Sequence, residues 1–114
     1  MIHVRRAGAL DTRALADLLN AIIAKGGTTA MVTPVTPREL QGWMTAPDSA
    51  WHLAEDERGE IKGFQYIEPH PDLPEGGVDV ATFVRLGETG FGIGSALFEQ
   101  TKTAARDLGY AHIH

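Results

Sequence analysis

The residues best placed to do chemistry in this sequence are the glycines of Thr89-Gly90-Phe91-Gly92-Ile93-Gly94-Ser95. Glycine lets backbone amides approach a ligand closely because it has no Cβ atom. The segment lies between a predicted strand and a predicted helix, whose first N–H groups and positive dipole end point at the same place. These features are typical of a phosphate or pyrophosphate site. The alternative is a tight strand-to-helix connection that binds nothing.

Two well-known nucleotide-binding loops do not fit this segment. A Walker loop requires Lys directly before Ser or Thr, and counting from Gly87 that position holds Ile93. A dinucleotide fingerprint requires a third glycine where this sequence has Ser95, and an acidic residue about 20 positions later, where the sequence has already reached His114. We therefore expect neither a nucleoside triphosphatase nor a Rossmann domain. A phosphate-binding domain of another fold stays open.

Three helices are predicted around the loop. Apolar residues from Leu15 to Ile22 recur at helical spacing, and Gly26–Gly27 end that helix. A second helix begins at Thr36-Pro37-Arg38-Glu39, which has the form of a capping box with proline in the first turn. The third is expected over Ser95–Leu108, directly after the glycines, and ends at Gly109.

Five strands complete the predicted architecture. They are expected at Ile2–Arg6 on an edge, and at Trp51–Glu55, Ile61–Glu68, Val78–Val84 and Tyr110–His114. The final strand–loop–helix–strand unit implies a parallel crossover, whereas the hairpins in the middle are antiparallel. The sequence therefore predicts an α/β (α+β) fold, with a mixed β-sheet flanked by helices.

Composition narrows the classes of function. The 114 residues suit one domain, 1–114, with a formal net charge of −5 and no cysteine. Negative charge argues against nucleic-acid binding, which needs clustered Lys and Arg. The longest apolar runs are too short to span a membrane, and the first residues do not form a signal peptide, so we expect a cytoplasmic protein. A small anionic ligand held by backbone amides remains compatible with this charge.

The run from Val84 to Ser95 resembles the coenzyme A-binding motif of the GNAT N-acetyltransferases. That motif has the form Arg/Gln-x-x-Gly-x-Gly/Ala at the end of the fourth strand. Gly92 and Gly94 match its two small positions, and Thr89 stands where Arg or Gln is usual. The order of the preceding helices and strands is also similar to the N-terminal half of this family.

The resemblance implies a GNAT-like mixed β-sheet and acetyl-CoA as co-substrate. It implies that backbone groups of Phe83 and Val84 pair with the pantetheine arm, which mimics an added strand. It further implies a pyrophosphate cradle made by Thr89, Gly90, Phe91, Gly92, Ile93, Gly94 and Ser95. Most of these contacts come from backbone amides, so the side chain missing at Thr89 leaves the cradle in place.

The reaction implied by the resemblance is transfer of an acetyl group from a thioester to an amine, on a small molecule or a peptide amino group. It requires a neutral amine, a polarised carbonyl and an acid for the thiolate. Candidate bases are Glu68, Asp79 and, in the loop between them, His70. No metal is expected, because His112 and His114 alone offer too few ligands. Tyr110 lies at the start of the last strand, so the acid role is not assigned to it.

Family members normally continue past the fifth strand into a further helix and a final pair of strands. We therefore expect a GNAT-like domain that lacks those last elements, and a homodimer that covers the exposed sheet edge. Two functions follow from the sequence. One is an acetyl-CoA-dependent N-acetyltransferase, and the other is a non-catalytic GNAT-like module that binds coenzyme A or a partner protein.

Overall fold

The computed structural model describes residues 2–26, 33–69, 77–87, 92–110 and 112–113. Its elements, in chain order, are β1 (His3–Arg6), a short 3-10 turn (Ala9–Asp11), α1 (Thr12–Lys25), α2 (Pro37–Met44), β2 (Ala50–Glu55), β3 (Ile61–Glu68), β4 (Gly77–Val84), α3 (Ile93–Asp107) and β5 (His112–Ile113). The predicted order of strands and helices is confirmed.

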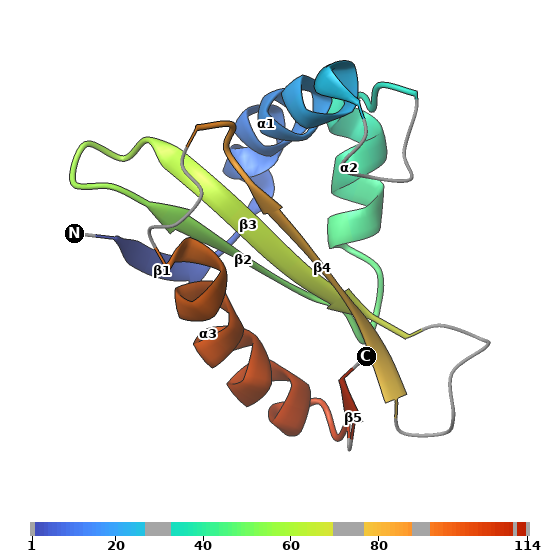
Figure 1. Ribbon diagram of the computed structural model, residues 1–114. Helices are drawn as coiled ribbons and strands as arrows, with labels where there is room; N and C mark the ends of the chain where they lie inside the picture. The colour runs from blue at the N-terminus through green and yellow to red at the C-terminus, as the bar shows by residue number, and fades with distance from the viewer. Residues whose placement is uncertain (1, 27–32, 70–76, 88–91, 111, 114) are drawn as a thin grey trace.

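The strands form one mixed sheet in the order β1-β2-β3-β4-β5. Neighbouring strands among the first four run antiparallel, and β5 runs parallel to β4 after the crossover through α3. Helices α1 and α2 cover one face of this sheet and α3 covers the other (Figure 1). The expected α/β sheet with helices on its faces is therefore confirmed.

Helices α1 and α2 begin and end where local sequence signals place them. The apolar positions of α1, from Leu15 to Ile23, are buried, and Gly26 follows its last turn with φ of 75°. At α2 the Thr36 hydroxyl oxygen accepts from the Glu39 amide at 3.1 Å, and the Glu39 carboxylate accepts from the Thr36 amide at 3.2 Å. This reciprocal capping box was predicted from the sequence.

Aromatic rings cover the sheet face beneath α1 and α2. Trp51 and Tyr66 stack with centroids 4.1 Å apart, and Phe64 and Phe83 stack at 5.1 Å. All four rings belong to the same buried cluster as the apolar face of α1. Burying side chains of this size contributes most of the apolar area removed from water. This face therefore holds the larger part of the core.

Helix α3 begins at Ile93, two residues before the predicted start at Ser95. Gly92 precedes it in the left-handed conformation, with φ of 72° and ψ of 16°, and Ile93 is already buried at 3% exposure. The sequence predicts a glycine-rich turn over Leu86–Ile93 and a helix that begins at Ser95. That boundary is wrong because a left-handed glycine turns the chain in a single residue, so the helix starts immediately after it.

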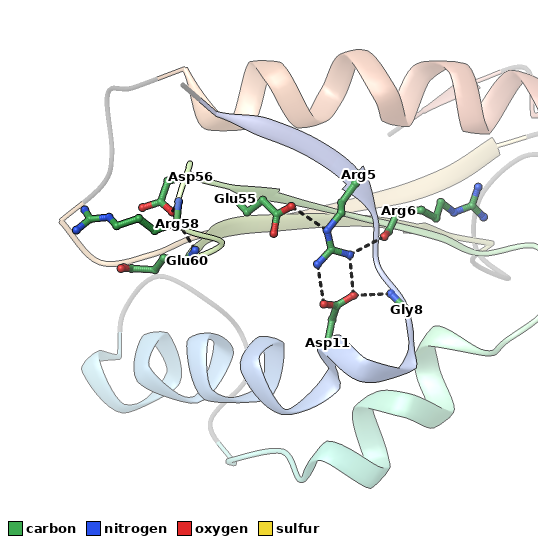
Figure 2. A network of polar contacts seen from close by, with 8 residues as sticks. All are labelled: Arg5, Arg6, Gly8, Asp11, Glu55, Asp56, Arg58 and Glu60. Carbon is green, nitrogen blue, oxygen red and sulfur yellow. Dashed lines mark hydrogen bonds and ion pairs between the residues drawn. The ribbon is translucent and has the colours of Figure 1, made fainter.

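An ion-pair network ties β1 to the start of α1 and to β2 (Figure 2). The Arg5 guanidinium donates to both carboxylate oxygens of Asp11, at 3.0 and 2.8 Å, and to Glu55 at 3.0 Å. The Gly8 amide also donates to Asp11, at 2.7 Å. The hydrogen bond from Arg5 is the main cause that lowers the pKa of Asp11 below 3.8. The network fixes the angle at which the chain enters α1.

Replacing Asp11 with Asn should destabilise the protein by about 1 kcal/mol at neutral pH, because it removes a charge-assisted pair that is partly exposed to water. A carboxylate whose folded pKa is lowered stabilises the protein fully above its ordinary value of 3.8, and the contribution is lost as pH falls through the folded pKa. The difference in unfolding free energy between the wild type and D11N should therefore disappear in strong acid.

Urea titrations of both proteins at several pH values measure this difference. Asp17→Asn, at an exposed position of α1, serves as the control and should change stability by less than about 0.5 kcal/mol. A constant difference between wild type and D11N from neutral pH into strong acid would contradict the role assigned to the Arg5–Asp11 pair.

Candidate functional site

The candidate site begins at the outer edge of β4. Among the described residues, β5 pairs with β4 at Gly77 and Val78, so the edge from Asp79 to Val84 has no strand beside it there (Figure 1). Unpaired N–H and C=O groups along such an edge can accept an extended ligand as an added strand. Phe83 and Val84, predicted to contact the pantetheine arm, lie on this stretch.

The edge leads toward the first turn of α3. Thr89, Gly90 and Phe91 lie outside the described residues, whereas Gly92, Ile93, Gly94 and Ser95 are described. The Gly92 carbonyl oxygen accepts the first bond of the helix, from the Ala96 amide at 3.0 Å. The preceding amides of Ile93, Gly94 and Ser95 then have no partner within the helix, as in every α-helix. This helix end offers N–H groups and the positive end of a dipole to an anion.

A cavity of about 320 Å³ lies beside this stretch of β4. Its walls come from the end of α1, from β4 and from the turn after it, through Ile22, Lys25, Thr82, Phe83, Val84, Leu86 and Gly87. The volume is at the lower end of those typical of ligand pockets. Both predicted pantetheine residues line it. Lys25, which sequence analysis did not single out, supplies a positive charge at its wall.

Gly63 on β3 determines how closely α3 and β4 approach each other. A Cβ atom at this position would lie 2.8 Å from the Phe83 carbonyl oxygen and 3.0 Å from Cγ2 of Ile93. The first contact is too short and involves backbone, and the second would require the Ile93 side chain to shift by a few tenths of an ångström. A glycine is therefore required at position 63, where β4, the strand predicted to bind the pantetheine arm, meets the start of α3.

The candidate bases Glu68 and Asp79 lie directly opposite each other on β3 and β4. Asp79 is exposed and Glu68 is half-buried. His70 lies outside the described residues. The structure thus brings two of the three candidates together, at the start of the same strand edge that borders the cavity.

Tyr66 lies near these two carboxylates. Burial, together with the smaller effect of the charges of Glu68 and Asp79, raises its pKa to about 12. The phenol is therefore protonated throughout the physiological range. It belongs to the aromatic core described above.

The hydroxyl group of Tyr110 makes a structural hydrogen bond. Its hydroxyl donates to the backbone carbonyl of Asp48, in the loop before β2, at 2.7 Å. Asp48 is held in the left-handed region with φ of 63°. The bond connects the segment before β5 to the start of β2, which is a structural role.

No group of three or more His, Cys, Asp and Glu side chains gathers into a metal site within the described ranges. The side chains of His112 and His114 lie outside those that can be described. Likewise, no helix in the described part of the chain is long and apolar enough to cross a bilayer.

No protein-family model and no curated protein sequence matches the chain. Solved structures match it closely in fold. A candidate phosphinothricin N-acetyltransferase is 26% identical with a TM-score of 0.78, over 96% of this chain and 68% of that one. A GNAT superfamily phosphinothricin acetyltransferase from Sinorhizobium meliloti, in complex with AcCoA, is 24% identical with a TM-score of 0.84, over 96% and 62%.

An N-acetyltransferase from Staphylococcus aureus Mu50 is 21% identical with a TM-score of 0.84, over 96% of this chain and 69% of that chain. The chain therefore spans about two thirds of the length of these structures. At this level of identity the likeness concerns the arrangement of strands and helices. It confirms the fold expected from the glycine motif and from the order of the elements.

Proposed function

Because the chain has the fold of the GNAT superfamily, we propose that it is an acetyl-CoA-dependent N-acetyltransferase. The observation that carries the proposal is the described unpaired edge of β4, which leads toward a left-handed Gly92 and the first amides of α3. A ligand that has both an extended arm and an anionic group requires an open strand edge for the arm and a helix end for the anion. Structural neighbours solved with AcCoA support the identity of that ligand.

The residues present fit such a cofactor. The backbone groups of Val84 face the described open edge of β4, beside the cavity, where they are free to bind the pantetheine arm, whereas the carbonyl of the neighbouring Phe83 faces β3. Gly92 and Gly94 carry no side chain to block the pyrophosphate, and a Cβ at Gly94 would meet only Thr82, at 3.9 Å. Gly94 therefore tolerates alanine, in agreement with the Gly/Ala position of the motif. The bound group supplies the acetyl thioester.

Asp79 and Glu68 are the proposed general bases. An amine must lose a proton before it attacks a thioester carbonyl, and a nearby carboxylate accepts that proton directly or through water. Asp79 is exposed on the cofactor strand itself, whereas Glu68 faces it from β3. The negative pair also favours a cationic amine at this end of β4. We propose Asp79 as the main base, since it shares the edge strand with Phe83 and Val84.

The test is acetyl transfer from acetyl-CoA to a panel of small amines and peptides, measured as release of free thiol. Wild type should turn over at least one acceptor. Asp79→Asn should lower kcat/KM by roughly 10²- to 10⁴-fold and leave CoA affinity within about twofold, because the base acts on the amine and not on the cofactor. Glu68→Gln identifies which carboxylate acts.

The outcomes separate the two functions inferred from the sequence. Calorimetric binding of CoA without turnover of any amine would favour the non-catalytic module. Absence of CoA binding by wild type would contradict both. If the D79N and E68Q variants each kept full turnover, the base would lie elsewhere. Four points stay predictions: an amine on a small molecule or a peptide as acceptor, the homodimer, the single domain over 1–114 and the cytoplasmic location.

A further inference from the structure

A hydrogen-bonded pair of side chains connects the interior of the sheet to the cavity beside β4. Gln65 and Thr82 lie directly opposite each other on β3 and β4, and Gln65 Nε2 donates to Thr82 Oγ1 at 2.7 Å. Gln65 is only 3% exposed, whereas Thr82 is exposed and lines the cavity. A buried amide therefore holds the hydroxyl group of an exposed residue of the edge strand, on the sheet face that α3 covers.

The side chain of Thr82 has a defined orientation. Its Cγ2 methyl lies toward the first turn of α3, 3.9 Å from the position of a Cβ on Gly94. Its Oγ1 is fixed by the bond from Gln65. Because a β-branched residue has few χ1 rotamers, these two contacts together select one of them. The hydroxyl oxygen uses one lone pair for Gln65 and keeps its hydrogen to donate.

The Thr82 hydroxyl hydrogen, which the bond from Gln65 does not use, points to an acceptor on a ligand. The Gln65 amide is buried and costs free energy unless its groups are bonded, so a purely structural role would be met as well by two apolar side chains. The pair instead presents a hydroxyl donor next to Phe83 and Val84, on the edge where the pantetheine arm is proposed to bind. That arm carries two amide groups, whose carbonyl oxygens accept hydrogen bonds.

We propose that Thr82 donates its hydroxyl hydrogen to an amide carbonyl oxygen of the pantetheine arm, with Gln65 as the residue that positions the hydroxyl. This inference rests on the proposed function. It adds a side-chain contact to a site otherwise made of backbone groups. It also explains why a polar side chain is buried beneath α3 at the position opposite Thr82.

Calorimetric titration of two ligands tests the contact. CoA contains the arm, whereas 3′-phospho-ADP is the same molecule without it. Thr82→Val keeps the shape and the methyl group but removes the donor, so it should weaken CoA binding by about three- to tenfold. It should leave 3′-phospho-ADP binding within about twofold. Thr82→Ser keeps the donor and should bind CoA within about threefold of wild type.

Gln65→Met tests the positioning role. It should weaken CoA binding less than Thr82→Val does, and should cause no further loss in the Thr82→Val background, because Gln65 acts on the ligand only through the Thr82 hydroxyl. Equal CoA affinity of T82V and wild type would overturn the inference, as would an equal loss for both ligands. Failure of the proposed function is distinguishable, since wild type itself would then not bind CoA.

Discussion

Replacing Gly92 with Asp is expected to abolish coenzyme A binding while the protein stays folded. Gly92 precedes α3 in the left-handed conformation, and a Cβ atom there would meet nothing within 4 Å. The new carboxylate would face the same point as the first amides of α3. Two like charges about 4 Å apart, at an effective dielectric of about 20, repel by about 4 kcal/mol. CoA affinity should therefore fall at least about a hundredfold.

The folded state should tolerate this change. Asp is one of the few residues that adopt the left-handed conformation at moderate strain, about 1 kcal/mol. At the N-cap of α3 it also interacts favourably with the helix dipole, which offsets part of that strain. Thermal unfolding should therefore change by only a few degrees.

Two variants control for strain and charge. Gly92→Asn has nearly the shape of Asp without its charge and should bind CoA more tightly than G92D by at least about tenfold. Gly59→Asp introduces the same charge at a left-handed glycine in the β2–β3 turn, with φ of 80° and open space around it. It should bind CoA like wild type. Unchanged affinity of G92D would mean that the pyrophosphate does not lie at this helix end.

Replacing Gly63 with Ala should have the largest effect on stability. The added methyl group would lie 2.8 Å from the Phe83 carbonyl oxygen and 3.0 Å from Ile93 Cγ2, so either β4 or the first turn of α3 must move. Overpacking of this kind costs about 1–3 kcal/mol. The melting temperature should fall by roughly 5–15 °C. CoA affinity should also fall, because Phe83 and Ile93 belong to the proposed site.

The matched control is Gly42→Ala. Gly42 is an exposed residue inside α2, and a Cβ there would meet nothing within 4 Å. Alanine is the better helix former, so this change should stabilise the protein by about 0.5–1 kcal/mol. Scanning calorimetry of both variants measures the contrast. A G63A protein as stable as wild type would show that α3 does not dock on β3 through this glycine.

The local elements of this fold were predictable because their signals are carried by neighbouring residues. The spacing of apolar residues from Leu15 to Ile22 identified one face of α1, and Thr36 with Glu39 identified the start of α2. The strand Ile61–Glu68 was predicted with its observed bounds. Each of these patterns depends on contacts within a few positions of the chain.

The start of α3 was not predictable in the same way. The positions from Gly90 to Gly94 alternate between glycine and a large apolar residue, and no local pattern says which glycine is left-handed. The helix begins at Ile93 because that side chain is buried against the strands, beside Gly63. This contact joins residues 30 positions apart in the sequence, so only the tertiary structure reveals it.

The sequence alone predicts the glycine segment Thr89–Ser95 and the candidates Glu68 and Asp79 as site residues, because their proposed chemistry depends on residue type and on the order of strand, loop and helix. The tertiary structure determines which of these residues lie close together. Strand register sets Glu68 opposite Asp79 and Gln65 opposite Thr82. The short pairing with β5 leaves the described edge of β4 open beside the cavity. These relations depend on long-range packing, because pairing between distant strands decides which side chains share a site.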